Sequence, residues 1–292
     1  MKNSRSSSLK KFFWLFSFVF FVCLFLGAVW FCLEIRRSPF YSLSRENFVL
    51  VTGDRKVVVL SLQGKEGLIV RLPEKDLVKT TRGFGDYELG KVYFLGELEG
   101  KGGLLIKETV QENFSLPVFG YFFASGEIDS LPQDSKKIFS YIFWQSFRGR
   151  IKTDLSRLDL LVLCWRTRSL NQPLVKKDSL SKLDDSLFRD KKLRDESFSL
   201  AVFNSTDHFS LAQQAARVLT EAGARVVRVA DTKEKQDDCL IIADPGLFKT
   251  YTFFWLRTVF GCQVRNSNAG DKRSDFSLVV GEEYWKKLNE KW

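Results

Sequence analysis

The chain opens with a long apolar run and then alternates short apolar segments with polar ones. Residues 12–33 carry no charge. As a helix rising about 1.5 Å per residue they would span roughly 33 Å, which matches the core of a bilayer. Bulky Trp30 and Phe31 stand where a cleavable signal needs small residues. We therefore predict an uncleaved transmembrane helix rather than a cleaved secretory signal.

The flanks of this run predict its orientation. The tail 1–11 contains four Lys or Arg residues and no acid. Because cytoplasmic flanks favour Lys and Arg, we place this tail in the cytoplasm. No second apolar run of similar length follows. We therefore expect a single-pass protein of the cell membrane, with everything after about Ser38 on the outer side.

The first part of the outer region has the pattern of a mixed α/β domain. Residues 48–62 read as two strands around a Gly-Asp turn. Glycines punctuate residues 80–103, which we expect to be loop-like. Residues 153–165 open with Thr and Asp caps and have helical spacing. Further strands are expected at 67–72 and 118–123, and further helices at 104–114 and 136–147.

The last part of the chain repeats the alternation after a break. Residues 166–196 mix both charge signs, which is typical of a solvated linker that can contain a short helix. From 197 to 292 strands and helices alternate, which favours helices packed on one sheet. We expect Ser210 to cap the first helix and Gly223 to end it. Strands are expected at 199–204, 225–230, 239–246, 262–266 and 275–281, with a second helix at 248–261.

Charge narrows the function classes. The net charge is +10, but residues 1–37 hold six basic residues and one acid. The remainder, with 39 basic and 34 acidic residues, is only mildly positive. Such a surface favours anionic envelope polymers, peptidoglycan or lipid headgroups. Nucleic acid is excluded, because the region lies outside and no Lys/Arg stripe is interleaved with aromatic residues.

Histidine and cysteine usage excludes further chemistry. The single His argues against a His-dependent hydrolase and against a multi-His metal site. The five Cys residues show no C-x-x-C spacing, so a zinc site is not expected. Cys239 and Cys262 could form a bridge outside the cell, and the sequence leaves that pairing open.

A set of short motifs runs in order through the C-terminal region. An Asn-small-Thr turn at Asn204, Ser205 and Thr206 follows a strand, a Pro-Gly turn comes later, and the last strand ends in Gly-acid. With this order and spacing, residues 197–285 resemble the LytR C-terminal domain. The matching segments are 202–206, 211–219, 222–224, 243–246 and 275–281.

The preceding region, 47–165, resembles a divergent LytR–CpsA–Psr domain. The similar segments are 57–61, 68–73, 89–93, 102–110 and 116–118. The resemblance implies an envelope protein. Active members of that family transfer glycopolymers from a polyprenyl-pyrophosphate carrier to the cell wall, with a divalent metal.

The charged positions of that family are altered here. Where the resemblance places the first metal carboxylate, this chain has Arg55 or Lys56, and Asp54 is one residue away. The family's Pro-Arg-Asp becomes Pro73 followed by an acid and then Lys75. An acid repels pyrophosphate and a lysine repels a metal. A one-residue slip in a strand also turns the side chain to the opposite face.

From these patterns we predict an α/β protein with a transmembrane helix, a divergent LytR–CpsA–Psr-like domain, a charged linker and a LytR C-terminal-like domain. We expect no catalytic residues, no metal ligands and no cofactor, and a role in binding or organising envelope polymers. A glycopolymer transferase using magnesium and an adaptor for a protein partner remain alternatives. The candidate ligand-binding residues are Arg55, Lys56, Lys75, Asp76 and Arg82.

Overall fold

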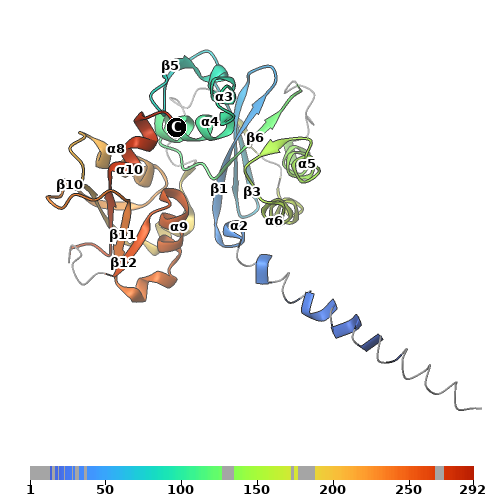
Figure 1. The fold of residues 1–292 in the computed structure, drawn as a ribbon. Coiled ribbons are helices and arrows are strands. Elements are labelled where there is room, and N and C mark those ends of the chain that lie inside the picture. Colours follow the sequence, from blue (N-terminus) through green and yellow to red (C-terminus); the bar gives the residue numbers. More distant parts are fainter. Residues whose placement is uncertain are drawn as a thin grey trace, which may run out of the picture.

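The computed structural model describes residues 38–126, 135–171, 174–176, 188–266 and 273–292, with helical residues scattered through 14–35. Within those residues no helix is both long and apolar enough to cross a membrane. The predicted span at 12–33 lies in part outside the described residues. Its described members include Trp14 and Phe25, which are helical and exposed. They lead away from two packed α/β units (Figure 1).

A six-stranded mixed sheet forms the centre of the first unit, in the order β7-β6-β1-β2-β3-β8. The hairpin and the third strand expected at 48–62 and 67–72 are confirmed as β1, β2 and β3, which pair antiparallel. Strand β6 pairs parallel with β1, and β8 pairs parallel with β3. The strands are β1 Arg45–Thr52, β2 Val57–Gln63, β3 Glu66–Leu72, β6 Gly120–Ala124, β7 Lys152–Thr153 and β8 Leu174–Lys176.

Helices cover both faces of this sheet, which is why every residue of β1 is buried. Phe48 packs on one face against Phe143, with ring centroids 5.8 Å apart. Val49 faces the other way, into a second core that includes Leu105 and Ile106. Figure 1 shows α3 and α4 on one side and α5 and α6 on the other. The helices are α2 Pro39–Ser42, α3 Leu89–Glu97, α4 Gly102–Phe114, α5 Ser135–Phe147 and α6 Arg157–Thr167.

Two expectations for this unit were wrong. Residues 80–103 are not a loop, because β4 Leu77–Thr80 pairs with β5 Gly85–Glu88 and α3 follows directly. Gly83 and Gly85 serve the turn between β4 and β5, with positive φ angles of 66° and 93°, whereas Gly90 and Gly96 lie inside α3. Helix α6 is not capped by Thr153 or Asp154. Its cap is Ser156, whose Oγ accepts from the backbone N–H of Asp159.

The second unit holds a five-stranded mixed sheet in the order β10-β9-β13-β11-β12. The α/β class is confirmed. Helix α10 was not expected, and Ser210 precedes α8 without a side-chain hydrogen bond to the helix. The elements are β9 Ser199–Asn204, α8 Leu211–Glu221, β10 Arg225–Asp231, β11 Leu240–Ala243, η4 Pro245–Lys249, α9 Tyr251–Phe260, β12 Gln263–Asn266, β13 Phe276–Val280 and α10 Glu282–Asn289.

Polar contacts join the two units beside a shared apolar core. Asp190, at the start of helix α7 (Lys191–Glu196), accepts hydrogen bonds from Ser44 of the first unit and from the hydroxyl of Tyr251. Burial, and then the neighbouring Asp190, raise the pKa of Tyr251. On the second unit, a disulfide joins Cys239 to Cys262, with Cα atoms 4.7 Å apart. This resolves the pairing that the sequence left open.

Candidate functional site

Four of the five residues proposed for ligand binding lie at one end of the first sheet. Arg55 and Lys56 form the turn between β1 and β2, and Lys75 and Asp76 follow β3. The register pairs Val57 with Leu72, so the two segments leave the sheet side by side. The start of α3 packs beside them, because the backbone N–H of Leu89 donates to the carbonyl oxygen of Asp76 at 3.0 Å.

We call the group formed by Asp54, Arg55, Lys56, Lys75 and Asp76 the charged turn; it contains an ion pair. Lys56 Nζ lies 3.0 Å from Asp54 Oδ2. Partial burial acts to raise the pKa of Asp54, but hydrogen bonds from Thr52 and Lys56 outweigh it and lower that pKa. Lys75 and Asp76 are exposed. Throughout the described part of the chain, no group of three or more His, Cys, Asp or Glu residues is placed to hold a metal ion.

Arg82 has different contacts. Its Nε and Nη2 atoms donate to the two carboxylate oxygens of Glu108 on α4, both at 2.8 Å. Its guanidinium also lies 5.5 Å from the ring centre of Trp292, and its backbone N–H donates to the carbonyl oxygen of Leu288. Arg82 therefore holds the first unit against the C-terminal helix.

The Asn204-Ser205-Thr206 turn is buried and bonded internally. Asn204 Oδ1 accepts from the backbone N–H and the hydroxyl of Thr206, at 3.1 and 2.8 Å. Its Nδ2 donates to Asp231 Oδ1 at 3.1 Å. Ser205 Oγ donates to the carbonyl oxygen of Val280 at 2.8 Å. These bonds tie β9 to β10 and β13, so the turn shapes the end of the sheet.

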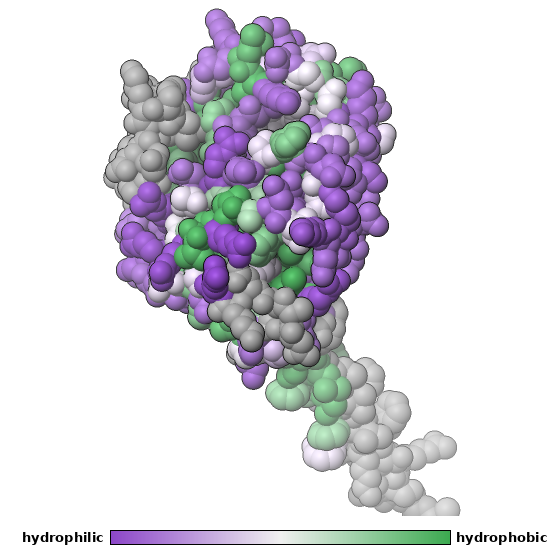
Figure 2. Space-filling view, turned by 90° about the vertical axis from the view of Figure 1, so that its left-hand side faces the viewer, coloured by the Kyte–Doolittle hydropathy of each residue, from purple (hydrophilic) through white to green (hydrophobic). Residues whose placement is uncertain are grey.

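A hollow of about 470 Å³ lies beside this turn, on the face of the second sheet opposite its helices. All five strands contribute to it. Apolar side chains line its floor and charged ones its rim; we call this the sheet hollow. Figure 2 shows green surface here among purple residues. Its lining is Phe203, Arg228, Asp231, Thr232, Lys233, Glu234, Gln236, Leu240, Ile242, Arg265, Ser277 and Val279.

Strand alternation explains why these side chains gather. Along β13, Phe276, Leu278 and Val280 point into the core, so Ser277 and Val279 point into the sheet hollow. Along β10 the pairing with β9 shifts register between Val226 and Arg228, so the alternation of side chains restarts at Arg228, which lines the sheet hollow. Sequence reasoning missed the sheet hollow because its residues are dispersed over five strands.

The arrangement suits an anionic ligand with apolar faces. Arg228 lies over the ring of Phe203, 5.4 Å from its centre, so one wall combines a cation with an aromatic face. Arg265 and Lys233 add positive charge to the lining. Arginine donates paired hydrogen bonds to phosphate or carboxylate groups, and apolar side chains can contact a sugar ring. The acids Asp231 and Glu234 provide acceptors for hydroxyl groups.

Glu46 lies outside the charged turn and the sheet hollow, and its pKa is strongly raised. Its side chain is fully buried and paired with Arg166. Burial raises its pKa to about 8, although Arg166 acts to lower it. Perturbed groups often mark functional sites, but structural pairs produce the same signature. Because Glu46 lies on β1, inside the first unit, we assign it to the structure.

The family comparison concerns the second unit. Residues 197–284 match the family described as LytR cell envelope-related transcriptional attenuator. The second unit is thus a LytR C-terminal domain, as the motif order predicted. A search of curated proteins found no match.

Similarity to solved structures is weak. TagT of B. subtilis is 15% identical with a TM-score of 0.34, covering 46% of this chain and 78% of TagT. TagT bound to LIIa-WTA gives 14% identity and a TM-score of 0.35, covering 48% and 80%. A transcriptional regulator from Enterococcus faecalis gives 11% and 0.39, covering 64% and 91%. These values are too low to carry an argument about function.

Proposed function

We propose that the protein is anchored in the cell membrane by residues 12–33 and binds an anionic envelope polymer on the outer side without catalysing its transfer. The tail 1–11 is cytoplasmic in this proposal. The observation that carries the binding role is the sheet hollow, which combines Arg228, Lys233 and Arg265 with an apolar floor. It lies in the domain that matches an envelope-related family.

The charged turn supports a non-catalytic role. A pyrophosphate-cleaving site needs arginines converging with carboxylates that hold a metal. Here Asp54 is paired with Lys56, and Arg82 is bound to Glu108. Lys75 occupies a position where the family resemblance implies a carboxylate. Asp54, Lys56 and Arg82 are therefore engaged with other side chains, and Lys75 carries the charge opposite to the one a metal ligand needs.

Polymer binding can be tested by co-sedimentation of the full chain in detergent with wall sacculi, either intact or stripped of anionic polymer. We expect binding to intact sacculi only. Arg265→Glu should weaken it about tenfold, because losing a charge-assisted contact costs about 1.5 kcal/mol. Arg257→Glu is the matched control, since Arg257 is an exposed arginine of α9 outside the sheet hollow. Equal losses in both variants would contradict the assignment.

A second assay separates binding from transfer. The full chain is incubated with magnesium and a polyprenyl-pyrophosphate analogue, and release of the carrier phosphate is measured. We expect none above the protein-free rate. Turnover that Asp54→Asn or Asp76→Asn abolishes would establish the transferase alternative instead.

A further inference from the structure

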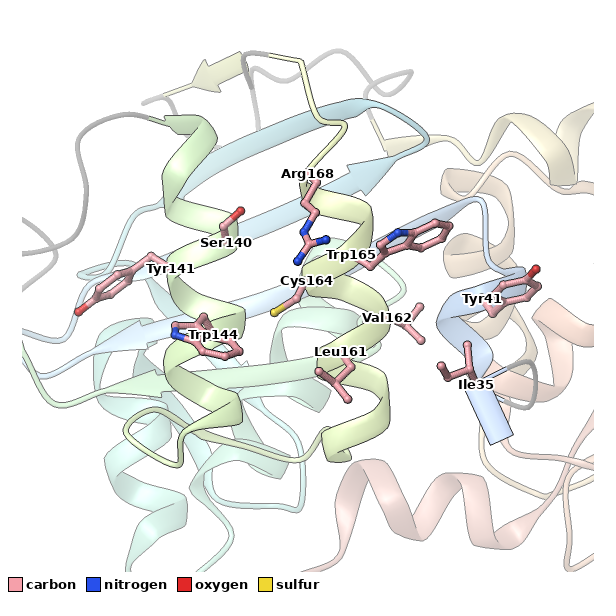
Figure 3. Close-up of a pocket in the computed structure, with 10 residues that line it drawn as sticks. All are labelled: Ile35, Tyr41, Ser140, Tyr141, Trp144, Leu161, Val162, Cys164, Trp165 and Arg168. Carbon is pink, nitrogen blue, oxygen red and sulfur yellow. The ribbon is translucent and has the colours of Figure 1, made fainter. Parts of the chain in front are cut away.

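An aromatic groove of about 890 Å³ lies on the first unit, distant in sequence from the sheet hollow. Helix α6 lies between α5 and the segment that carries Ile35 and Tyr41, and side chains from all three line the groove, as Figure 3 shows. The groove is lined by Ile35, Tyr41, Ser140, Tyr141, Trp144, Leu161, Val162, Cys164, Trp165 and Arg168.

Large aromatic side chains stand exposed around this aromatic groove. Trp165 is 62% exposed, Tyr41 50%, Trp144 43% and Tyr141 37%. Exposed aromatic residues gathered in one place on a soluble surface mark an interaction site. Trp and Tyr in particular are the residues that occupy the interface between water and lipid, because each has an apolar ring and a polar group.

The charges around the groove are mainly positive. Arg168 is the one charged residue in its described lining, and the guanidinium of Arg148 lies 5.0 Å from the ring centre of Trp144. A second hollow adjoins the groove and shares Trp165 with it. Its charged residues are Lys65, Arg166, Lys191 and Lys192 against Glu66 and Asp195. This surface complements anionic headgroups.

The position of the groove along the chain identifies what covers it. Ile35 is part of its lining and stands two residues after Leu33, the end of the apolar run 12–33. At about 1.5 Å per helical residue, two residues advance the chain by only about 3 Å. If the run crosses the membrane, the groove begins at the membrane surface.

We propose that the aromatic groove is seated in the headgroup region of a phospholipid bilayer, with Trp144 and Trp165 at the depth of the interface. This inference rests on the anchoring of residues 12–33 in the proposed function and extends it. The first unit then lies against the membrane instead of projecting freely. The binding is reinforced by anionic lipid, through Arg148, Arg168 and the neighbouring lysines.

The test uses the full chain labelled with fluorinated tryptophan, reconstituted in bilayers of phosphatidylcholine and phosphatidylglycerol. A lipid carrying a nitroxide near its headgroup broadens the fluorine signal of any tryptophan close to it. The chain has seven Trp residues, and single Trp→Phe variants assign each signal. Trp14 reports on the anchor. Trp292, 37% exposed at the other end of the chain, is the matched control.

We expect Trp14, Trp144 and Trp165 to lose most of their signal and Trp292 to keep it. Bilayers without phosphatidylglycerol should restore part of the Trp144 and Trp165 signals. If Trp14 is broadened while Trp144 and Trp165 behave like Trp292, the groove does not contact lipid and the inference is wrong, although the anchor stands. A groove covered by a second copy of the chain would give this same result. An unaffected Trp14 would overturn the anchor and the groove together.

Discussion

Replacing Arg82 by alanine should lower the free energy of unfolding of the protein without weakening its binding to the polymer. Arg82 was a candidate ligand residue on sequence grounds, yet its guanidinium makes two hydrogen bonds of 2.8 Å to Glu108. The Glu108 side chain is only 4% exposed and that of Arg82 17%. Removing the arginine leaves a buried carboxylate without its counter-ion.

The expected loss is large. Breaking a buried ion pair by removing one partner costs about 3–5 kcal/mol, and the contact with Trp292 adds about 0.5–1 kcal/mol. Arg82 is not fully buried, so we expect a loss near the lower limit, about 3 kcal/mol. That is a large share of the roughly 5–15 kcal/mol by which a typical protein is stable.

Urea unfolding of the full chain in detergent micelles, followed by circular dichroism, measures the effect. Lys75→Ala is the control, since Lys75 is an exposed candidate residue and should change the unfolding free energy by less than about 0.5 kcal/mol. The double variant Arg82→Ala/Glu108→Ala should cost less than the sum of the single variants. Unchanged stability of Arg82→Ala, combined with weaker binding to sacculi, would refute the structural role.

Three further outcomes follow from the structure. Because burial raises the pKa of Glu46 from 4.5 to about 8, the unfolding free energy should fall as pH rises across this range. The slope is at most about 1.4 kcal/mol per pH unit, and Glu46→Gln should flatten it; an equal slope in both proteins would contradict this. Replacing Cys239 and Cys262 by serine should lower the unfolding free energy by about 3 kcal/mol in urea titrations, because the disulfide closes a loop of 23 residues; an unchanged midpoint would contradict it. Gly103→Ala should lower the melting temperature, since a Cβ atom there would lie 2.0 Å from the Tyr121 ring; an unchanged melting temperature would show that the ring moves at no cost.

Much of the fold could be predicted because its elements have strong local patterns. The β1–β2 hairpin was read from two apolar runs around a Gly-Asp turn, and α8 from its helical spacing and the glycine that ends it. Helix α3 was missed because the glycines around it suggested a loop. Of the glycines in this region, Gly90 and Gly96 lie inside the helix and are buried with Leu89, Val92 and Tyr93.

The binding surfaces were harder to predict, because they depend on tertiary arrangement. The residues of the charged turn were proposed as ligand-binding candidates from a family resemblance. The structure does bring Arg55, Lys56, Lys75 and Asp76 to one end of the sheet. Sequence order gave no sign that Arg82 would pair with Glu108. The sheet hollow depends on strand order, which places Arg228 and Arg265 around one floor although they lie on the two edge strands.

The most direct test of polymer binding without transfer is a titration of the full chain in lipid nanodiscs with poly(glycerol phosphate), in the presence of magnesium and a polyprenyl-pyrophosphate analogue. Neutral dextran serves as the control polymer. We predict saturable binding of the phosphate polymer, about tenfold weaker binding by Arg265→Glu, and no cleavage of the pyrophosphate. Binding that Arg265→Glu leaves unchanged, or pyrophosphate cleavage that depends on Asp54, would contradict it.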